Sequence, residues 1–175
     1  MNEVLETLKA RRSVRLFKSD LPTDDELKAI VEAGLYAPSG RNMQEVITIV
    51  VKNKELRDEI AEVNRQIGGW KEGFDPFYQA PVIIIVLGNK ERPTHVYDGS
   101  VALENMMLAA TSLGLGSCWI HRAKEEFEMP RFKQLLKDLH IEGDWEGIGH
   151  LAIGYPAKDN NDVPKRKEGR VYTID

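Results

Sequence analysis

Residues 1–67 carry hydrophobic side chains mainly at the spacing of an α-helix. Apolar positions three and four apart predict helices over 4–8, 23–35 and 53–67. The second of these begins with the capping-box sequence Thr23-Asp24-Asp25-Glu26. It is expected to end before Ala37-Pro38, because the residue before a proline disfavours helix. Asn53 is a suitable cap for the third helix.

Runs of apolar and β-branched residues predict buried strands over 46–51, 82–87, 117–120 and 146–154. Residues 98–113 are apolar almost all the way round, which predicts a helix in the core or at a subunit interface. Helix is also expected over 127–139, with a possible break at Pro130. Residues 68–79 have no period and predict a loop or lid, and a polar tail begins at Tyr155.

This mixture of helices and strands predicts an α+β fold with a small central sheet. A chain of 175 residues with 42% hydrophobic and 30% charged residues is typical of one globular domain spanning residues 1–175. The net charge of -4 argues against nucleic acid as a partner.

The single cysteine and the lack of long apolar runs indicate where in the cell the protein is located. Cys118 has no partner for an intrachain disulfide, and residues 1–6 lack the core of a signal peptide. The longest strongly apolar run, 82–87, is too short to cross a bilayer. We therefore expect a cytoplasmic protein without a membrane partner.

The sequence Arg11-Arg12-Ser13-Val14-Arg15 places three guanidinium groups and a hydroxyl within five residues. In an extended segment Arg11, Ser13 and Arg15 would share one face. Lys165-Arg166-Lys167 forms a second cationic cluster. The arginine cluster is equally typical of a solvated basic turn after a helix, and the second cluster alone is most often a solvated tail.

A second candidate segment is Ala37-Pro38-Ser39-Gly40-Arg41-Asn42-Met43-Gln44. Its glycine permits close approach to the backbone, and its carboxamides offer donors and acceptors to a heteroaromatic ring. Such a segment alone is most often only a loop. Beside the arginine cluster, however, it indicates a planar ligand that carries a phosphate, as in a nucleotide-type cofactor.

Other chemistry is not supported by the sequence. Gly114-Leu115-Gly116-Ser117 is typical of a helix end followed by a strand, and it lacks the spacing of a dinucleotide fingerprint. The four histidines have no paired ligand spacing, so no metal site is expected. Ser13 and Ser39 lack the context of a hydrolase nucleophile.

Five segments in order resemble the FMN-dependent nitroreductase family. They are Arg11-Arg12-Ser13-Val14-Arg15-Leu16-Phe17, Ala37-Pro38-Ser39-Gly40-Arg41-Asn42-Met43-Gln44, Ala80-Pro81-Val82-Ile83, Leu113-Gly114-Leu115-Gly116-Ser117-Cys118-Trp119-Ile120 and Ile153-Gly154-Tyr155-Pro156. The resemblance implies a nitroreductase-like fold, with a central, mainly antiparallel sheet flanked by helices. It also implies an intertwined homodimer with two FMN sites at its interface.

The resemblance further implies a set of cofactor-binding residues. They are Arg11, Arg12, Ser13, Arg15, Pro38, Ser39, Gly40, Asn42, Gln44, Ile120, His121, Arg122, Lys165 and Arg166. Arg11 and Ser13 would bind the phosphate and ribityl chain, and Arg15 would reach the pyrimidine side of the ring. The group from Pro38 to Gln44 would come from the other subunit. Residues 120–122 would contact the ring through backbone groups, and Arg166, with Lys165, would close on the phosphate.

The function that follows from the resemblance is transfer of hydride from NADH or NADPH, through FMN, to a nitroaromatic, a quinone or a related small acceptor. A ping-pong cycle is expected, and no side chain is assigned as an obligatory acid or base. The alternative is a non-catalytic FMN-binding or flavin-sequestering protein. A globular domain without a cofactor is the third interpretation.

Overall fold

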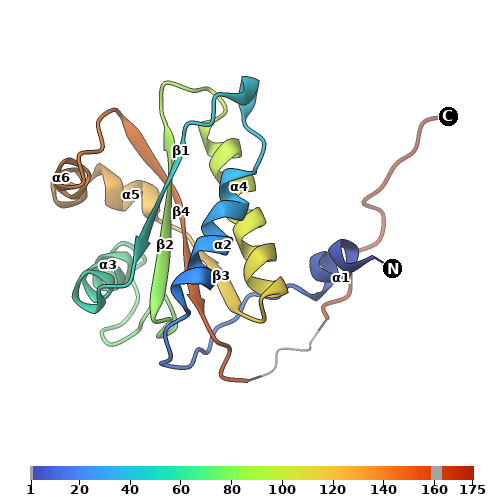
Figure 1. Cartoon of the computed structure of the whole chain (residues 1–175), viewed down its shortest axis with the longest axis horizontal. Helices are drawn as coiled ribbons and strands as arrows, with labels where there is room; N and C mark the ends of the chain where they lie inside the picture. Colours follow the sequence, from blue (N-terminus) through green and yellow to red (C-terminus); the bar gives the residue numbers. More distant parts are fainter. Residues whose placement is uncertain (1, 159–162) are drawn as a thin grey trace.

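A single sheet organises the computed structural model, which describes residues 2–158 and 163–175 (Figure 1). Its strands are β1 (Val46–Val51), β2 (Val82–Asn89), β3 (Gly116–Ile120) and β4 (Trp145–Gly154). They lie in the order β1-β2-β4-β3, and each neighbouring pair is antiparallel. The predicted antiparallel sheet is therefore confirmed, with β2 and β4 at its centre.

Strand β2 is buried on both faces, which explains its continuous apolar sequence. Even-numbered residues from Val82 to Val86 belong to one hydrophobic cluster, whereas odd-numbered residues from Ile83 to Leu87 belong to another. This alternation follows from the two-residue period of a strand. The core consequently consists of two layers, one on each side of the sheet.

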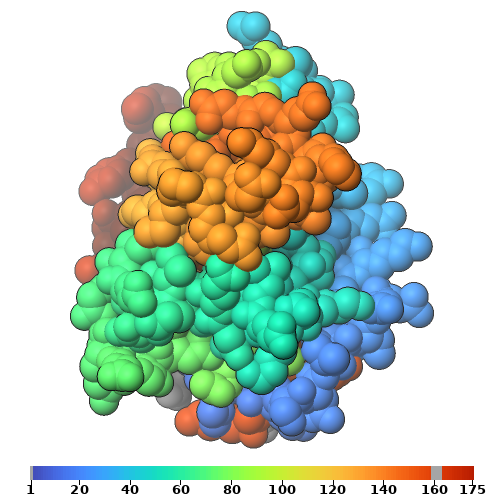
Figure 2. Space-filling model, turned by 90° about the vertical axis from the view of Figure 1, so that its left-hand side faces the viewer, coloured from blue at the N-terminus to red at the C-terminus, as the bar shows by residue number. Residues whose placement is uncertain are grey.

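Helices cover both faces of the sheet. The α-helices of the described residues are α1 (Glu3–Ala10), α2 (Asp24–Leu35), α3 (Lys54–Ile67), α4 (His95–Ser112), α5 (Ala123–Glu128) and α6 (Pro130–Asp138). Helices α2 and α4 pack on one face, and α3, α5 and α6 pack on the other (Figure 1). Figure 2 shows the second face, where α3, α5 and α6 form a continuous outer layer. The α+β fold predicted from the sequence is confirmed.

Helix α1 and the tail lie apart from the main body of the molecule (Figure 1). None of the residues of α1 is buried, and its apolar residues Val4, Leu5 and Leu8 are exposed. Residues 163–175 extend beyond α1 without helix or strand, and all of them are exposed. These two segments therefore contribute little to the core of this chain.

The helix boundaries differ from the sequence-based expectation in two places. Helix α4 begins at His95, three residues before the predicted start at Asp98. Helix α5 begins at Ala123, four residues before the predicted start, and the break considered at Pro130 is present, because Met129 is extended, with φ -75° and ψ 142°. Pro130 then occupies the first turn of α6, where its missing N–H costs nothing. No helix in the described part of the chain is long and apolar enough to cross a membrane.

Candidate functional site

The arginine segment that follows α1 is held in an extended form at the end of the sheet. The backbone N–H of Val14 donates to the carbonyl of Ser117 over 2.9 Å, and Ser13 forms a parallel bridge with Ser117. A Cβ at Gly116 would lie 2.9 Å from the Val14 side chain, so glycine there permits the close approach. The segment therefore has the extended form in which Arg11, Ser13 and Arg15 would share one face.

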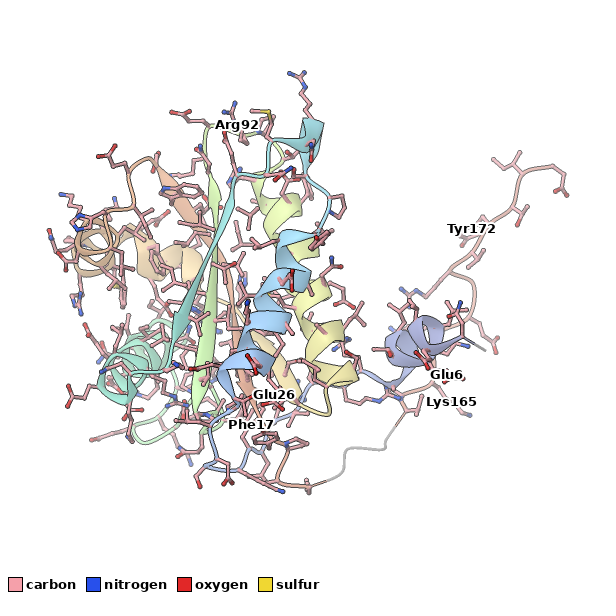
Figure 3. The ribbon with its side chains drawn as sticks, viewed as in Figure 1. Glu6, Phe17, Glu26, Arg92, Lys165 and Tyr172 are labelled. Atoms are coloured by element: carbon pink, nitrogen blue, oxygen red, sulfur yellow. The ribbon has the colours of Figure 1, made fainter. Side chains whose placement is uncertain are left out.

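The structure brings both cationic clusters together around one cavity of about 590 Å³. Its lining residues are Arg11, Arg12, Ser13, Arg15, Val163, Pro164 and Arg166. Lys165 is not among them, although Figure 3 places it on the same side of the molecule as α1. The cavity lies within the size range of small-molecule sites, which is about 300–1,000 Å³. A cavity with this lining is suited to an anionic ligand.

Arg11 carries a donor for which the described residues provide no acceptor. Its Nε is buried and makes no hydrogen bond, and Oε1 of Glu104 lies 3.6 Å away as an ion-pair partner. Arg12 differs, because its Nη1 donates to the carbonyls of Lys9 and Arg11 over 2.7 Å. The Arg11 side chain as a whole is 27% exposed and lines the cavity, so its accessible part can meet an anionic oxygen there.

The thiol of Cys118 is buried beside the arginine segment. Burial raises the pKa of this thiol. The charge of Arg15, a hydrogen bond with Ser13 and the charge of Arg11 each lower that pKa to a smaller extent. The side chain therefore stays a neutral thiol at neutral pH. No nucleophilic role follows for it.

The segment from Pro38 to Gln44 has an unusual backbone. Arg41, Asn42 and Gln44 have φ of 54°, 56° and 54°, in the left-handed region that non-glycine residues seldom adopt. The N–H of Gly40 donates to Asp98 over 3.0 Å, and a Cβ on Gly40 would lie 2.3 Å from Oγ1 of Thr94. Such clusters of backbone strain are typical of ligand-contacting loops.

Side chains of the same segment also restrain it. The N–H of Gln44 donates to Oγ of Ser39 over 2.9 Å, and Nε2 of Gln44 donates to Oδ1 of Asn42 over 3.0 Å. Pro38, Ser39 and Gln44 line a separate cavity of about 170 Å³, next to α2, α4 and β1.

Within one chain the two predicted halves of the site are far apart. The N–H of Gly40 is hydrogen-bonded to Asp98 in the first turn of α4. Ser13 forms its β-bridge with Ser117, just beyond the other end of that helix. Helix α4 has 18 residues, so at 1.5 Å per residue it spans about 27 Å. Figure 1 shows the two segments at opposite ends of α4. One copy of the chain therefore cannot use both on the same ligand.

The end of β3 supplies the third predicted group. Ile120 is buried and pairs with His150, and the carbonyl of His121 accepts a hydrogen bond from Nδ2 of Asn64 over 2.9 Å. Arg122 has φ 81°, and its guanidinium carbon lies 4.3 Å from the centre of the Trp70 ring. The chain thus turns sharply directly after the strand.

The loop over residues 68–79 contacts two of the predicted site residues. Trp70, near the start of the loop, stacks on Arg122. Near the end of the loop, the ring centre of Tyr78 lies 5.9 Å from the guanidinium carbon of Arg15. Phe74 packs between the two aromatic rings, 5.1 Å from Trp70 and 6.3 Å from Tyr78. This aromatic row links the end of β3 to the arginine segment. Its role as a lid remains a prediction.

Sequence reasoning missed a buried polar cluster formed by Asn64, Glu126 and His150. All are fully buried and joined by hydrogen bonds. One signal was present, because Asn64 follows Ile60 by four residues and so interrupts the apolar face of α3. Among the described residues, no group of three or more histidine, cysteine or acidic side chains is arranged to hold a metal ion.

Comparison with known proteins gives consistent matches. The profile described as Nitroreductase family matches residues 8–155. The crystal structure of a nitroreductase with bound FMN from Bacteroides fragilis has a TM-score of 0.88 and 34% identity, over 100% of both chains. One from Desulfitobacterium hafniense, also with bound FMN, has a TM-score of 0.88 and 29% identity, over 99% of this chain and 100% of that one.

A relative from Bacillus subtilis named FMN reductase [NAD(P)H] is 27% identical over 187 residues. The match covers 94% of this chain and 70% of the relative.

Proposed function

The chain belongs to the nitroreductase family, and from that premise we propose that it is an FMN-dependent oxidoreductase. It takes hydride from NADH or NADPH and passes it to a nitroaromatic, a quinone or a related small acceptor. Relatives bearing the names nitroreductase and FMN reductase support this activity. A cytoplasmic location, expected from the sequence, belongs to the same proposal.

The cavity between the arginine segment and the tail is the observation that carries the proposal. The FMN phosphate is close to a dianion, and guanidinium groups bind such oxygens through charge-assisted hydrogen bonds. Arg11, Arg12 and Arg166 line this cavity, and the Arg11 side chain is 27% exposed. These residues fit a terminal phosphate, with Ser13 as an additional donor.

Each part of the chain has a distinct role in this proposal. FMN supplies the acceptance and donation of hydride when it is bound. Arg11, Arg12, Ser13 and Arg166 hold the phosphate end, whereas Arg15 lies toward the pyrimidine side. The backbone of residues 120–122 contacts the ring. The aromatic row over 68–79 shields that region from water. Since the redox chemistry belongs to the cofactor, none of these side chains is assigned as an acid or base.

A homodimer is part of the proposal, because the segment from Pro38 to Gln44 lies at the far end of α4 from the cavity. A second copy of the chain would supply it. The exposed apolar residues of α1 and of the tail support such an assembly, since they have little contact with their own chain. The outer face of α4, which includes Val101 at 37% exposure, is also available to a partner.

The identity of the flavin and the order of substrate binding test this function. We expect the chain to bind FMN and not FAD, as identified by chromatography of the flavin released on denaturation. Steady-state plots against NADH or NADPH at several quinone concentrations should be parallel, because one pocket would be used in turn. Recovery of FAD, or failure to bind added FMN, would contradict the cofactor assignment. Intersecting lines would contradict the ping-pong cycle.

A further inference from the structure

Asn64, Glu126 and His150 form a fully buried polar cluster beneath the end of β3. Nδ2 of Asn64 donates to Oε1 of Glu126 over 2.6 Å, and Nε2 of His150 lies 2.5 Å from Oε2 of the same carboxyl group. Each residue comes from a different element: α3, α5 and β4. The cluster thus joins three separate parts of the chain at one point.

The amide of Asn64 also reaches the backbone of the candidate site. Its Nδ2 donates to the carbonyl of His121 over 2.9 Å. A trans peptide is planar, so its C=O and N–H groups point in opposite directions. The His121 carbonyl points toward Asn64, and the N–H of Arg122, in the same peptide, therefore points away from the buried cluster.

This peptide needs to be held, because the next residue is strained. Arg122 has φ 81° and ψ 6°, a left-handed conformation that costs energy in any residue with a Cβ. Such a conformation persists where the surroundings fix it. Asn64 is positioned to do so through His121, and Glu126 fixes the amide of Asn64 in turn.

We propose that Asn64, held by Glu126, is a positioning residue for the flavin. It fixes the peptide between His121 and Arg122 so that the Arg122 N–H is presented to the isoalloxazine ring. The inference rests on the proposed FMN site and adds the residues that shape it from within the core. Asn64 acts only through the backbone and is not itself in contact with the ring.

The unaltered chain provides the first test. In ¹H–¹⁵N spectra, the amide proton of Arg122 should shift downfield when FMN is added, because it gains an acceptor. An Arg122 amide that does not move while FMN binds would overturn the inference and leave the proposed function intact. If FMN does not bind at all, the proposed function fails and this inference fails with it.

The second test replaces Asn64 by leucine, which has a similar size but no donor. We expect Asn64→Leu to weaken FMN binding about tenfold and to abolish the Arg122 shift. Leu136→Ala, a core change on α6, controls for lost stability, and it should keep both the affinity and the shift. Unchanged FMN affinity in Asn64→Leu would mean that the cluster is only structural.

The third test is a pair of Glu126 variants, which tests the positioning role even if Asn64→Leu does not fold. Glu126→Gln keeps an oxygen acceptor for Asn64, and His150 can accommodate the new amide by changing tautomer. Glu126→Leu removes that acceptor. We expect Glu126→Gln to retain the FMN affinity and the Arg122 shift, and Glu126→Leu to lose both. Equal behaviour of the two variants would overturn the inference.

Discussion

Arg11 is the residue on which the proposed phosphate site depends most directly. It lies at the end of α1, and its buried Nε finds no acceptor among the described residues. Its ion-pair partner at 3.6 Å, Glu104, is 43% exposed, so solvent screens this pair. A ligand phosphate in the cavity would meet the accessible part of the Arg11 side chain.

We predict that Arg11→Ala weakens FMN binding by about 1.5–3 kcal/mol, the range for a hydrogen bond to a charged group. Arg131→Ala is the matched control, because Arg131 is paired with Glu59 on the α3–α6 surface, away from the cavity. Dissociation constants from fluorescence titration would separate the two. If both variants bind FMN equally well, the phosphate site is misplaced.

Site residues could be predicted from the sequence where they are contiguous in the chain. The arginine cluster is one such group, and the structure places four of its residues at one cavity with Arg166. In contrast, Asn64 lies 62 residues before Glu126, and Glu126 lies 24 residues before His150. Only the fold brings these three residues together. A single polar residue on an apolar helix face does not identify its partners.

Among the elements, α2 shows how a local sequence signal fixes one end of a helix. Oγ1 of Thr23 accepts from the N–H of Glu26, and the Glu26 carboxylate accepts from the N–H of Thr23, as the capping box predicted. The hydroxyl of Tyr155 also donates to this carboxylate over 2.8 Å. The backbone hydrogen bond from Thr23 is the largest of the effects that lower the pKa of Glu26, followed by the Thr23 and Tyr155 hydroxyls.

Replacing Glu26 by glutamine should remove a contribution to stability that depends on pH. The pKa of Glu26 is lower in the folded state than in the unfolded state, where it is about 4.3. The Glu26 carboxylate therefore contributes its full free energy of stabilisation above the unfolded pKa, and this contribution is lost as pH falls through the folded pKa. We expect Glu26→Gln to cost about 0.3–1 kcal/mol at pH 7 and progressively less below pH 4. Urea unfolding at a fixed protein concentration measures this.

The control is Glu32→Gln, in the exposed last turn of the same helix. A negative charge there opposes the helix dipole, so its removal should not destabilise the protein. A loss in Glu26→Gln that is the same at every pH would contradict the role assigned to its carboxylate.

Most elements were predictable because their apolar period is long and regular, as in α3 and β2. The start of α4 was not, because Thr94 makes no side-chain capping hydrogen bond and so leaves no capping signal. The start of α5 at Ala123 was missed as well, because the residue before it, Arg122, is not one that usually caps a helix. Pro130 is compatible with both the interruption of a helix and the first turn of a new one, and only the structure distinguishes them.

For the whole molecule, the exposed tail is the feature most difficult to explain in a lone chain. Val171 and Tyr172 are each 87% exposed, and Ile174 is 98% exposed. The tail and the unburied helix α1 lie on the same side of the molecule (Figure 1), and both carry exposed apolar side chains. In the proposed dimer this surface would pack against the second copy.

We predict that the double substitution Tyr172→Ser and Ile174→Ser raises the dimer dissociation constant at least tenfold. Each buried aromatic or aliphatic side chain contributes about 1.5–3 kcal/mol. Leu139→Ser is the control, because Leu139 is exposed at the end of α6, on the opposite side of the sheet from α4. Sedimentation equilibrium gives the constants. A monomeric unaltered chain at micromolar concentration, with FMN bound, would refute the dimer.

In the proposed activity, FMN moves hydride from a nicotinamide to an acceptor. Anaerobic titration of the FMN-loaded protein with NADH and, separately, with NADPH tests it most directly. We expect at least one of them to bleach the visible absorbance of the flavin, and a quinone or nitroaromatic added afterwards to restore it. A bound flavin that neither nucleotide bleaches would contradict the enzyme and indicate a flavin-sequestering protein.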